Sequence, residues 1–292
     1  MREEQDSLGT RDLPDEAYYG IQTLRATENF PVTGRREPPS LIRAYALVKQ
    51  AAALANMELG ALDRPRGEAI AAAAAEVAAG GLADQFPVDV FQAGAGTSFN
   101  MNVNEVIANR ALEILGRGRG EYGFLSPNDH VNLSQSSNDT FPTASHLAVI
   151  GEADTLLGCL REVALSLARK GAEFRGLPKT GRTHLMDALP VTLGDEFGAW
   201  AAALARAADR VRERRDGLLE IALGGTATGT GAGTPPGYRG AVVAHLSRLT
   251  GLPLVPARDS LEALQSRSSL AAFSGALRDL ALELIRLAND LR

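Results

Sequence analysis

The feature that most constrains the fold is a regular stripe of apolar residues near the end of the chain. It is formed by Leu270, Phe273, Leu277, Leu280, Leu284, Leu287 and Leu291. This spacing of three and four places them on one face of an α-helix, which must be buried against other helices. Similar patterns cover about 142–174 and 189–218. Because three such helices cannot fill a compact core alone, the pattern predicts a long-helix bundle shared between subunits.

The rest of the chain indicates an all-α fold. Shorter helices are expected at about 40–60, 65–80 and 101–116. Runs of alternating β-branched residues are rare, so strands are minor at most. We expect a mostly helical N-terminal domain over 1–139 and a central long-helix bundle over 140–292 that is incomplete at its C-terminus. Pro142 is expected to open the first long helix, since proline is tolerated in a first helical turn.

Charge and composition exclude several classes of protein. The net charge is −5, which does not fit a broad nucleic-acid-binding surface. No apolar run is long enough to span a bilayer, and the acidic, polar start is unlike a secretory signal, so a cytoplasmic location is the default expectation. The single cysteine, Cys159, excludes an internal disulfide or a cysteine metal cluster. Its apolar neighbours predict a buried thiol.

Three short polar segments have the same chemistry. They are Gly94–Asn100, Ser134–Asp139 and Thr180–His184, and each is rich in hydroxyl or amide groups. Two of them precede long helices, where free backbone amides and the helix dipole favour an anion. Each segment could instead be a simple N-cap or turn with no ligand. Three such segments on one helical scaffold favour a binding site for a carboxylate.

Other kinds of catalytic site find little support in the sequence. No cluster of His, Cys or acidic residues has metal-ligand spacing, and no P-loop or strand-linked GxGxxG is present. A Ser–His–acid hydrolase is a weak alternative, because no GxSxG elbow occurs. Neutral hydrogen-bond donors suit a small dicarboxylate and can stabilise a carboxylate that gains charge during proton abstraction.

Several longer runs resemble the aspartase/fumarase superfamily of lyases. They are GAGTSFNMNVNEVIANRA, NDHVNLSQSSNDTFPTA, GRTHLMDALPVTLGDEF, LGGTATGTG and LANDLR. The N-terminal text, including LGTRDLPDEAYYGIQTLRATENF and DQFPVDVFQ, is more similar to aspartate ammonia-lyases than to class II fumarases. The SSND form at Ser136–Asp139 is fumarase-like, which keeps a class II fumarate hydratase as the alternative.

The resemblance implies a reaction and a set of site residues. The reaction is the reversible deamination of L-aspartate to fumarate and ammonia through an aci-carboxylate intermediate. The implied substrate-binding residues are Thr97, Ser98, Asn100, Ser136, Ser137, Asn138, Thr183 and His184. Of these, Thr183 and His184 are also implied to be catalytic. The resemblance further implies no organic cofactor, no metal-ligand set, a divalent cation at most as an activator, and a homotetramer with shared active sites.

One element of the family pattern is missing from the sequence. The superfamily has a GSSxMPxKxNP loop beyond LANDLR, and its serine is taken to be the general base. This chain ends at Arg292, before such a loop. We therefore expect a truncated member of the family that is inactive alone, and a non-catalytic fragment remains an alternative interpretation.

Overall fold

The computed structural model covers residues 1–292 and describes all of them except the side chain of Ala95. Contacts divide the chain into two compact units. The first unit combines Met1–Ala148 with Leu219–Ser266, and the second combines Val149–Leu218 with Arg267–Arg292. This division differs from the expected boundary at 139/140. Apolar periodicity identifies helices but does not tell which helix pairs with which, so it could not reveal that the chain returns to the first unit.

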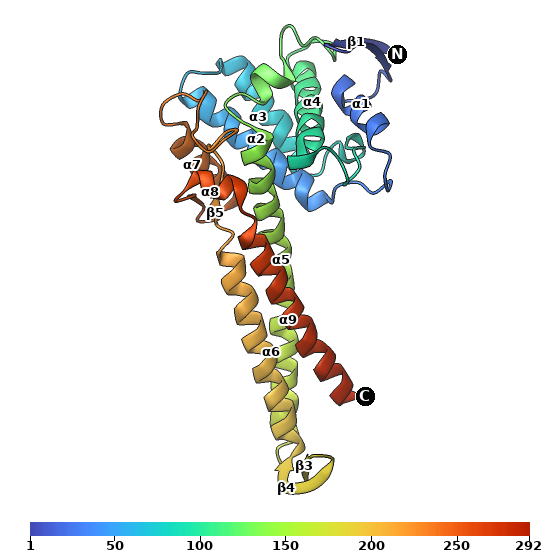
Figure 1. Cartoon of the computed structure of the whole chain (residues 1–292), viewed down its shortest axis with the longest axis vertical. Helices are drawn as coiled ribbons and strands as arrows, with labels where there is room; N and C mark the ends of the chain where they lie inside the picture. Colours follow the sequence, from blue (N-terminus) through green and yellow to red (C-terminus); the bar gives the residue numbers. More distant parts are fainter. The chain divides into compact units, whose positions relative to one another are not determined.

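The first unit is built around a core of short helices (Figure 1). Its elements in chain order are β1 Arg2–Asp6, β2 Gly9–Leu13, α1 Ile21–Asn29, α2 Pro39–Glu58, α3 Arg64–Ala78, η1 Ala83–Gln85, η2 Gly94–Gly96, α4 Thr97–Ile114, the π-helical turn η3 Pro127–Val131, the start of α5 Ser137–Glu173, β5 Glu220–Ile221, α7 Tyr238–Thr250, β6 Val255–Pro256 and α8 Ser260–Gln265. The three shorter helices predicted from sequence are confirmed as α2, α3 and α4.

Helix α2 is central to this core. It packs against α3 on one side and α7 on another, and its alanines at 51, 52, 53 and 55 are buried. Small side chains let helix backbones approach closely, so the alanine-rich sequence corresponds to tight packing. Antiparallel β1 and β2 form a separate hairpin, with Arg2 opposite Leu13. The fold is mostly helical, as predicted.

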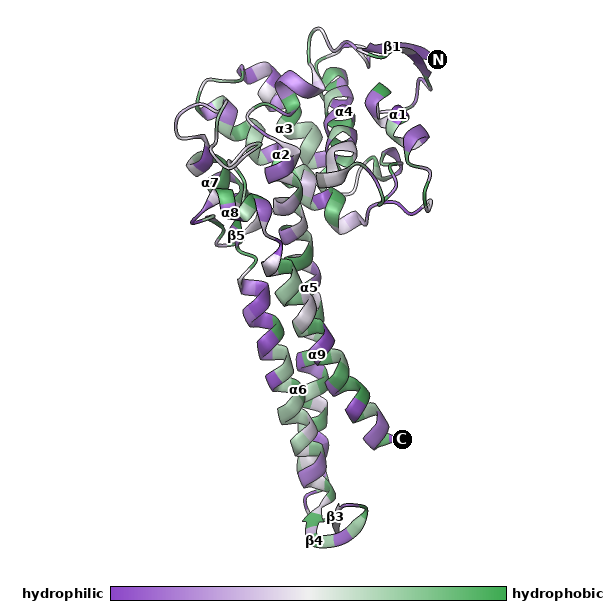
Figure 2. Ribbon diagram, viewed as in Figure 1, coloured by the Kyte–Doolittle hydropathy of each residue, from purple (hydrophilic) through white to green (hydrophobic). Residues whose placement is uncertain are grey.

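The second unit contains the remainder of α5, the hairpin of β3 Pro178–Thr183 and β4 Met186–Thr192, α6 Leu193–Asp216, and α9 Ser268–Leu291. Helix α6 packs along α9, and the indole of Trp200 donates a hydrogen bond to Asp290 at 3.2 Å. Figure 2 shows that hydrophobic and hydrophilic residues alternate along these helices. On α9, Leu282, Ile285 and Leu291 remain exposed, so its apolar surface is only partly covered within the chain.

Four local expectations need correction. Helix α5 begins at Ser137, with Pro142 inside it, because the side chains of Ser136 and Asp139 cap the helix before the proline. Helix α6 begins at Leu193, since Thr192 and Asp195 form a capping box there. The segment before α6 is a β-hairpin. Cys159 is exposed, because it lies on a face of α5 that no part of its unit covers.

Candidate active site

The first two predicted loops meet at the N-termini of α4 and α5. Thr97 is the first residue of α4, and Ser137 is the first residue of α5. Their hydroxyl oxygens lie 3.2 Å apart. The first amides of a helix have no acceptor within the helix and carry the positive end of its dipole. Two such ends, each bearing a hydroxyl, form a surface that can bind an anion.

Gly96 explains how the two helices approach each other. It precedes α4 with a φ of +73°, a left-handed conformation that favours glycine. A Cβ at this position would collide with the ring of Phe141 on α5. The glycine therefore provides both the turn into α4 and the space for the aromatic ring.

A buried polar network lies among the residues of these two loops. The Lys49 side chain on α2 is fully buried. Its ammonium group donates hydrogen bonds to the side-chain oxygens of Asn100 at 2.7 Å, Asn132 at 2.9 Å and Gln135 at 2.9 Å. One cation thus connects α2, α4 and the segment leading into α5. Because all three acceptors are amide oxygens, the network holds the ammonium without a directly paired carboxylate.

Burial also changes the acidity of Lys49. It lowers the pKa of this side chain to about 7, while the charge of Asp139 acts in the opposite direction. The only sign of this lysine in the sequence is weak: it is a lone cation within an otherwise apolar and alanine-rich stretch. Sequence reasoning missed it, because helical lysines are usually solvated.

The same network changes the interpretation of Asn100. Its side chain is 3% exposed. Its Oδ1 accepts from Lys49 and from the Tyr45 hydroxyl, and its Nδ2 donates to Asn132 at 3.2 Å. With both ends of the amide engaged inside the protein, Asn100 fits a supporting role better than the direct substrate contact that we expected. Thr97 is exposed and Ser98 is half-buried, so these two remain accessible.

Ser136 and Asp139 fix the start of α5. The Ser136 hydroxyl accepts a hydrogen bond from the amide of Asn138 at 3.2 Å. Asp139 Oδ1 accepts one from the amide of Ser136 at 3.0 Å. This is a capping-box arrangement, in which the side chains at the helix start satisfy free amides. Ser136, Ser137 and Asn138 are all half-buried and follow one another at the same helix end.

The carboxylate of Asp139 is itself buried. Its Oδ2 accepts hydrogen bonds from the amides of Gly224 at 3.0 Å and Thr226 at 2.9 Å. Burial raises the pKa of Asp139 to about 6, although the backbone hydrogen bonds and Lys49 act to lower it. Sequence analysis treated this residue only as a possible cap, because its partners are more than eighty positions away.

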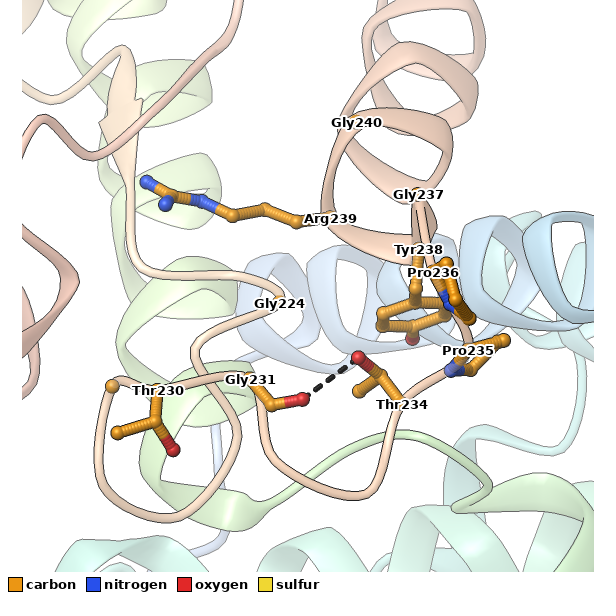
Figure 3. A pocket seen from close by; sticks show the side chains of 11 residues that line it. Gly224, Thr230, Gly231, Thr234, Pro235, Pro236, Gly237, Tyr238, Arg239 and Gly240 are labelled. Atoms are coloured by element: carbon orange, nitrogen blue, oxygen red, sulfur yellow. Dashed lines mark hydrogen bonds between the residues drawn. The ribbon is translucent and has the colours of Figure 1, made fainter.

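A pocket of about 290 Å³ lies beside this distant segment. Figure 3 shows it between the glycine-rich loop and the start of α7, where the Thr234 hydroxyl donates to the Gly231 carbonyl at 2.8 Å. Its lining consists of Gly224, Gly229, Thr230, Gly231, Thr234, Pro235, Pro236, Gly237, Tyr238, Arg239 and Gly240. None of the predicted site residues lines this pocket, so it is separate from the surface formed by Thr97 and Ser137.

The third predicted loop belongs to the second unit and forms a β-hairpin. Thr183 ends β3 opposite Met186. His184 and Leu185 form the two-residue turn, with φ values of +50° and +61°. Positive φ at both positions is typical of type I′ hairpin turns. Thr183 and His184 are exposed. Their unit is separate from that of the other two loops, so the structure brings together two of the three predicted loops.

The described residues contain no group of three or more His, Cys, Asp or Glu side chains arranged to hold a metal ion. Among the same residues, no helix is long and apolar enough to cross a membrane. The chemistry available at the junction of α4 and α5 is that of hydroxyls, amides and helix N-termini. This chemistry suits binding of a small carboxylate.

Comparison with known proteins identifies the family. The chain matches the lyase family over residues 9–292. It is 48% identical to an aspartate ammonia-lyase of Bacillus sp over 292 residues, which are 100% of this chain and 62% of that protein. It is 46% identical to a class II fumarate hydratase of Thermosynechococcus vestitus with the same two coverages. The chain thus spans 62% of the length of these curated relatives.

A solved structure agrees with these matches. The fumarate lyase:delta crystallin of Brucella melitensis superimposes with a TM-score of 0.97 at 48% identity, covering 100% of this chain and 64% of that one. Both the sequence and the fold of the chain are thus similar to those of these proteins over its whole length. The protein is a member of the lyase family, within the aspartase/fumarase superfamily.

Proposed function

We propose that this protein is an aspartate ammonia-lyase and that the junction of α4 and α5 contributes to its substrate site. The reaction is the reversible conversion of L-aspartate to fumarate and ammonia. The observation that carries the proposal is the 3.2 Å approach of the Thr97 and Ser137 hydroxyls at two helix N-termini. Similarity to an aspartate ammonia-lyase at 48% identity supports the choice of substrate.

The proposed chemistry needs donors where negative charge grows. Removal of a proton from the carbon beside the β-carboxylate places a second negative charge on that group, giving an aci-carboxylate. Breaking of the carbon–nitrogen bond then releases ammonia and leaves fumarate. Donors stabilise this intermediate only if they are already oriented toward it. Thr97, Ser98 and Ser137 are the proposed donors, and Asn138 completes this part of the site.

The remaining roles extend the proposal to the hairpin. Thr183 and His184 are proposed to contact the substrate, with His184 either positioning it or assisting proton transfer. The general base is not assigned to any residue of this chain. We further propose that the whole protein is a homotetramer with shared active sites and needs no organic cofactor, a divalent cation serving at most as an activator. The partly exposed apolar face of α9 supports assembly.

The test is a direct comparison of two substrates with the full-length gene product. Fumarate formation is followed by its ultraviolet absorbance, first with L-aspartate and then with L-malate. The proposal expects turnover of aspartate and little or none of malate. Robust malate dehydration without aspartate turnover would instead identify a class II fumarate hydratase, which the 46% identity to such an enzyme makes the second candidate.

A companion assay uses the 292-residue chain alone. We expect it to bind dicarboxylates weakly and to produce no fumarate from aspartate, because no base is assigned within it. Measurable lyase activity of the purified chain would contradict that assignment and would require a base among its own residues. Activity of the full-length gene product, with no activity of the 292-residue chain, would support both statements.

A further inference from the structure

The loop Leu223–Gly231 has no part in the proposed chemistry, although its conformation is tightly constrained. Residues 221–226 are buried. Gly224 and Thr226 have φ values of +90° and +57°, and left-handed backbone is costly for a β-branched residue such as threonine. A Cβ at Gly229 would lie 2.8 Å from the backbone of Leu261. Such a strained backbone persists only where surrounding contacts hold it, and strained segments often occur at functional sites.

Asp139 supplies two of those contacts. Its Oδ1 caps α5 through the amide of Ser136, and its Oδ2 binds the amides of Gly224 and Thr226. One buried carboxylate therefore connects the helix start that carries Ser137 and Asn138 to a segment more than eighty residues later in the chain. An uncharged side chain of the same shape cannot accept hydrogen bonds in both directions.

The loop also contacts a residue of the proposed site. The Nδ2 of Asn138 donates a hydrogen bond to the carbonyl oxygen of Ala227 at 2.9 Å. This bond fixes the orientation of the side-chain amide, because one end is occupied by the loop. The Oδ1 of Asn138 is then directed as an acceptor. If the loop moved, the Asn138 amide could rotate. Either its Oδ1 acceptor or its Nδ2 donor could then face the substrate.

We propose that Asp139 is a positioning residue for the substrate site, acting on Asn138 through the loop Leu223–Gly231. The inference rests on the proposed function of Asn138 as a substrate contact. Asp139 binds the loop through the amides of Gly224 and Thr226, the neighbouring Ala227 carbonyl orients the Asn138 amide, and that amide contacts the substrate. Asp139 itself does not touch the substrate in this account.

A double-mutant cycle on the full-length gene product separates this role from a purely structural one. The variants are Asp139→Asn, Asn138→Ala and the double variant, with kcat and KM measured for the substrate that the wild type turns over. We expect Asp139→Asn to lower kcat/KM about tenfold in the wild type and less than about twofold in the Asn138→Ala background, since coupled residues are not additive. Equal losses in both backgrounds would overturn the inference.

Glu105 provides a matched control. It is also a buried carboxylate, and it accepts hydrogen bonds from the backbone amides of Gly20, Gln22 and Thr23. Glu105→Gln should lower stability in the same way as Asp139→Asn, but its effect on kcat/KM should be the same with or without Asn138. The same double-mutant cycle is measured with Glu105→Gln in place of Asp139→Asn. If the effects on kcat/KM are equally non-additive in both cycles, the cause is general destabilisation, and the inference is overturned.

Two further measurements apply if Asp139→Asn does not fold or if no turnover is seen. If Asp139→Asn does not fold, Gly224→Ala distorts the loop while leaving Asp139 unchanged, because a Cβ there would lie 2.8 Å from Arg239 and φ is +90°, and it should show the same dependence on Asn138. Hydrogen exchange needs no turnover: Asp139→Asn should speed amide exchange at 223–231, and Glu105→Gln at 20–23 instead. Unchanged exchange at 223–231 would overturn the inference by itself. A wild type inactive with both substrates would contradict only the proposed function.

Discussion

The segment before α5 and the hairpin before α6 were predicted to be similar loops, but their structures differ in kind. Residues 134–139 are fixed by contacts with distant parts of the chain: the Lys49 side chain binds Gln135, and Asp139 binds the backbone amides of Gly224 and Thr226. Residues 178–192 are fixed mainly by their own backbone pairing, and the turn residues His184 and Leu185 are exposed. The first is supported by a folded core, and the second by local strand pairing.

The two parts of the proposed site are therefore ordered by different kinds of contact. Donors at α4 and α5 are oriented by buried groups before any ligand arrives, which is the requirement for stabilising developing charge. Thr183 and His184 receive no such support from side chains within their own unit. Substitution of the buried residues that contact residues 134–139 should therefore reduce stability and activity together. Substitution of exposed hairpin residues should reduce activity alone.

The largest effect is expected from Lys49→Met. It removes the shared donor of three amide oxygens, and buried acceptors without partners are costly. We expect the free energy of unfolding to fall by about 3 kcal/mol, measured by urea denaturation, with loss of activity. A stable and active Lys49→Met protein would show that the buried network is not what orders residues 134–139.

The same variant has a signature in its pH dependence. The folded pKa of Lys49 is about 7, below its ordinary 10.5. Between these values the unfolded chain binds a proton that the folded chain does not, so stability rises with pH. The wild type should gain stability relative to Lys49→Met from pH 7 to pH 9. If the unfolding free energy of the wild type instead fell relative to that of Lys49→Met between pH 7 and pH 9, a lowered pKa of Lys49 would be contradicted.

A smaller effect is expected from Gly96→Ala. The new methyl group meets the ring of Phe141, and φ at this position is +73°. Both the overlap and the left-handed backbone disfavour alanine, and we expect a loss of about 2 kcal/mol in the free energy of unfolding. Gly94→Ala is the control, because a Cβ there meets nothing within 4 Å. Equal losses in the two variants would argue against the close approach of α4 and α5.

The smallest effect on stability is expected from His184→Gln. The side chain is exposed, so the free energy of unfolding should change by less than about 0.5 kcal/mol. Activity of the full-length gene product should nevertheless fall, and the separate changes in kcat and KM would distinguish proton transfer from substrate positioning. A large loss of stability in His184→Gln would show that the hairpin is supported as firmly as the segment before α5.

Some of this structure was predictable from sequence and some was not. Apolar spacing identified α2, α3, α4 and the long helices, because each buries one face. The polar segments that contain Thr97 and Ser137 were recognised by their chemistry, and the structure places these two residues at the starts of α4 and α5. Lys49 and the partners of Asp139 were missed, since burial of a charge depends on contacts distant in sequence. The hairpin at Thr183 was missed because its strands are short and are interrupted by Gly181 and Pro190.

We propose that the Thr97 and Ser137 hydroxyls, at two adjoining helix N-termini, bind a dicarboxylate. This is tested by calorimetric titration of the full-length gene product with fumarate, using Thr97→Val and Ser137→Ala, with Glu105→Gln as the control. Each of the first two variants should weaken fumarate binding by about tenfold or more, since a lost hydrogen bond to a charged group costs about 1.5–3 kcal/mol. The control should bind as the wild type does. Unchanged affinity in both Thr97→Val and Ser137→Ala would show that these hydroxyls do not bind the dicarboxylate.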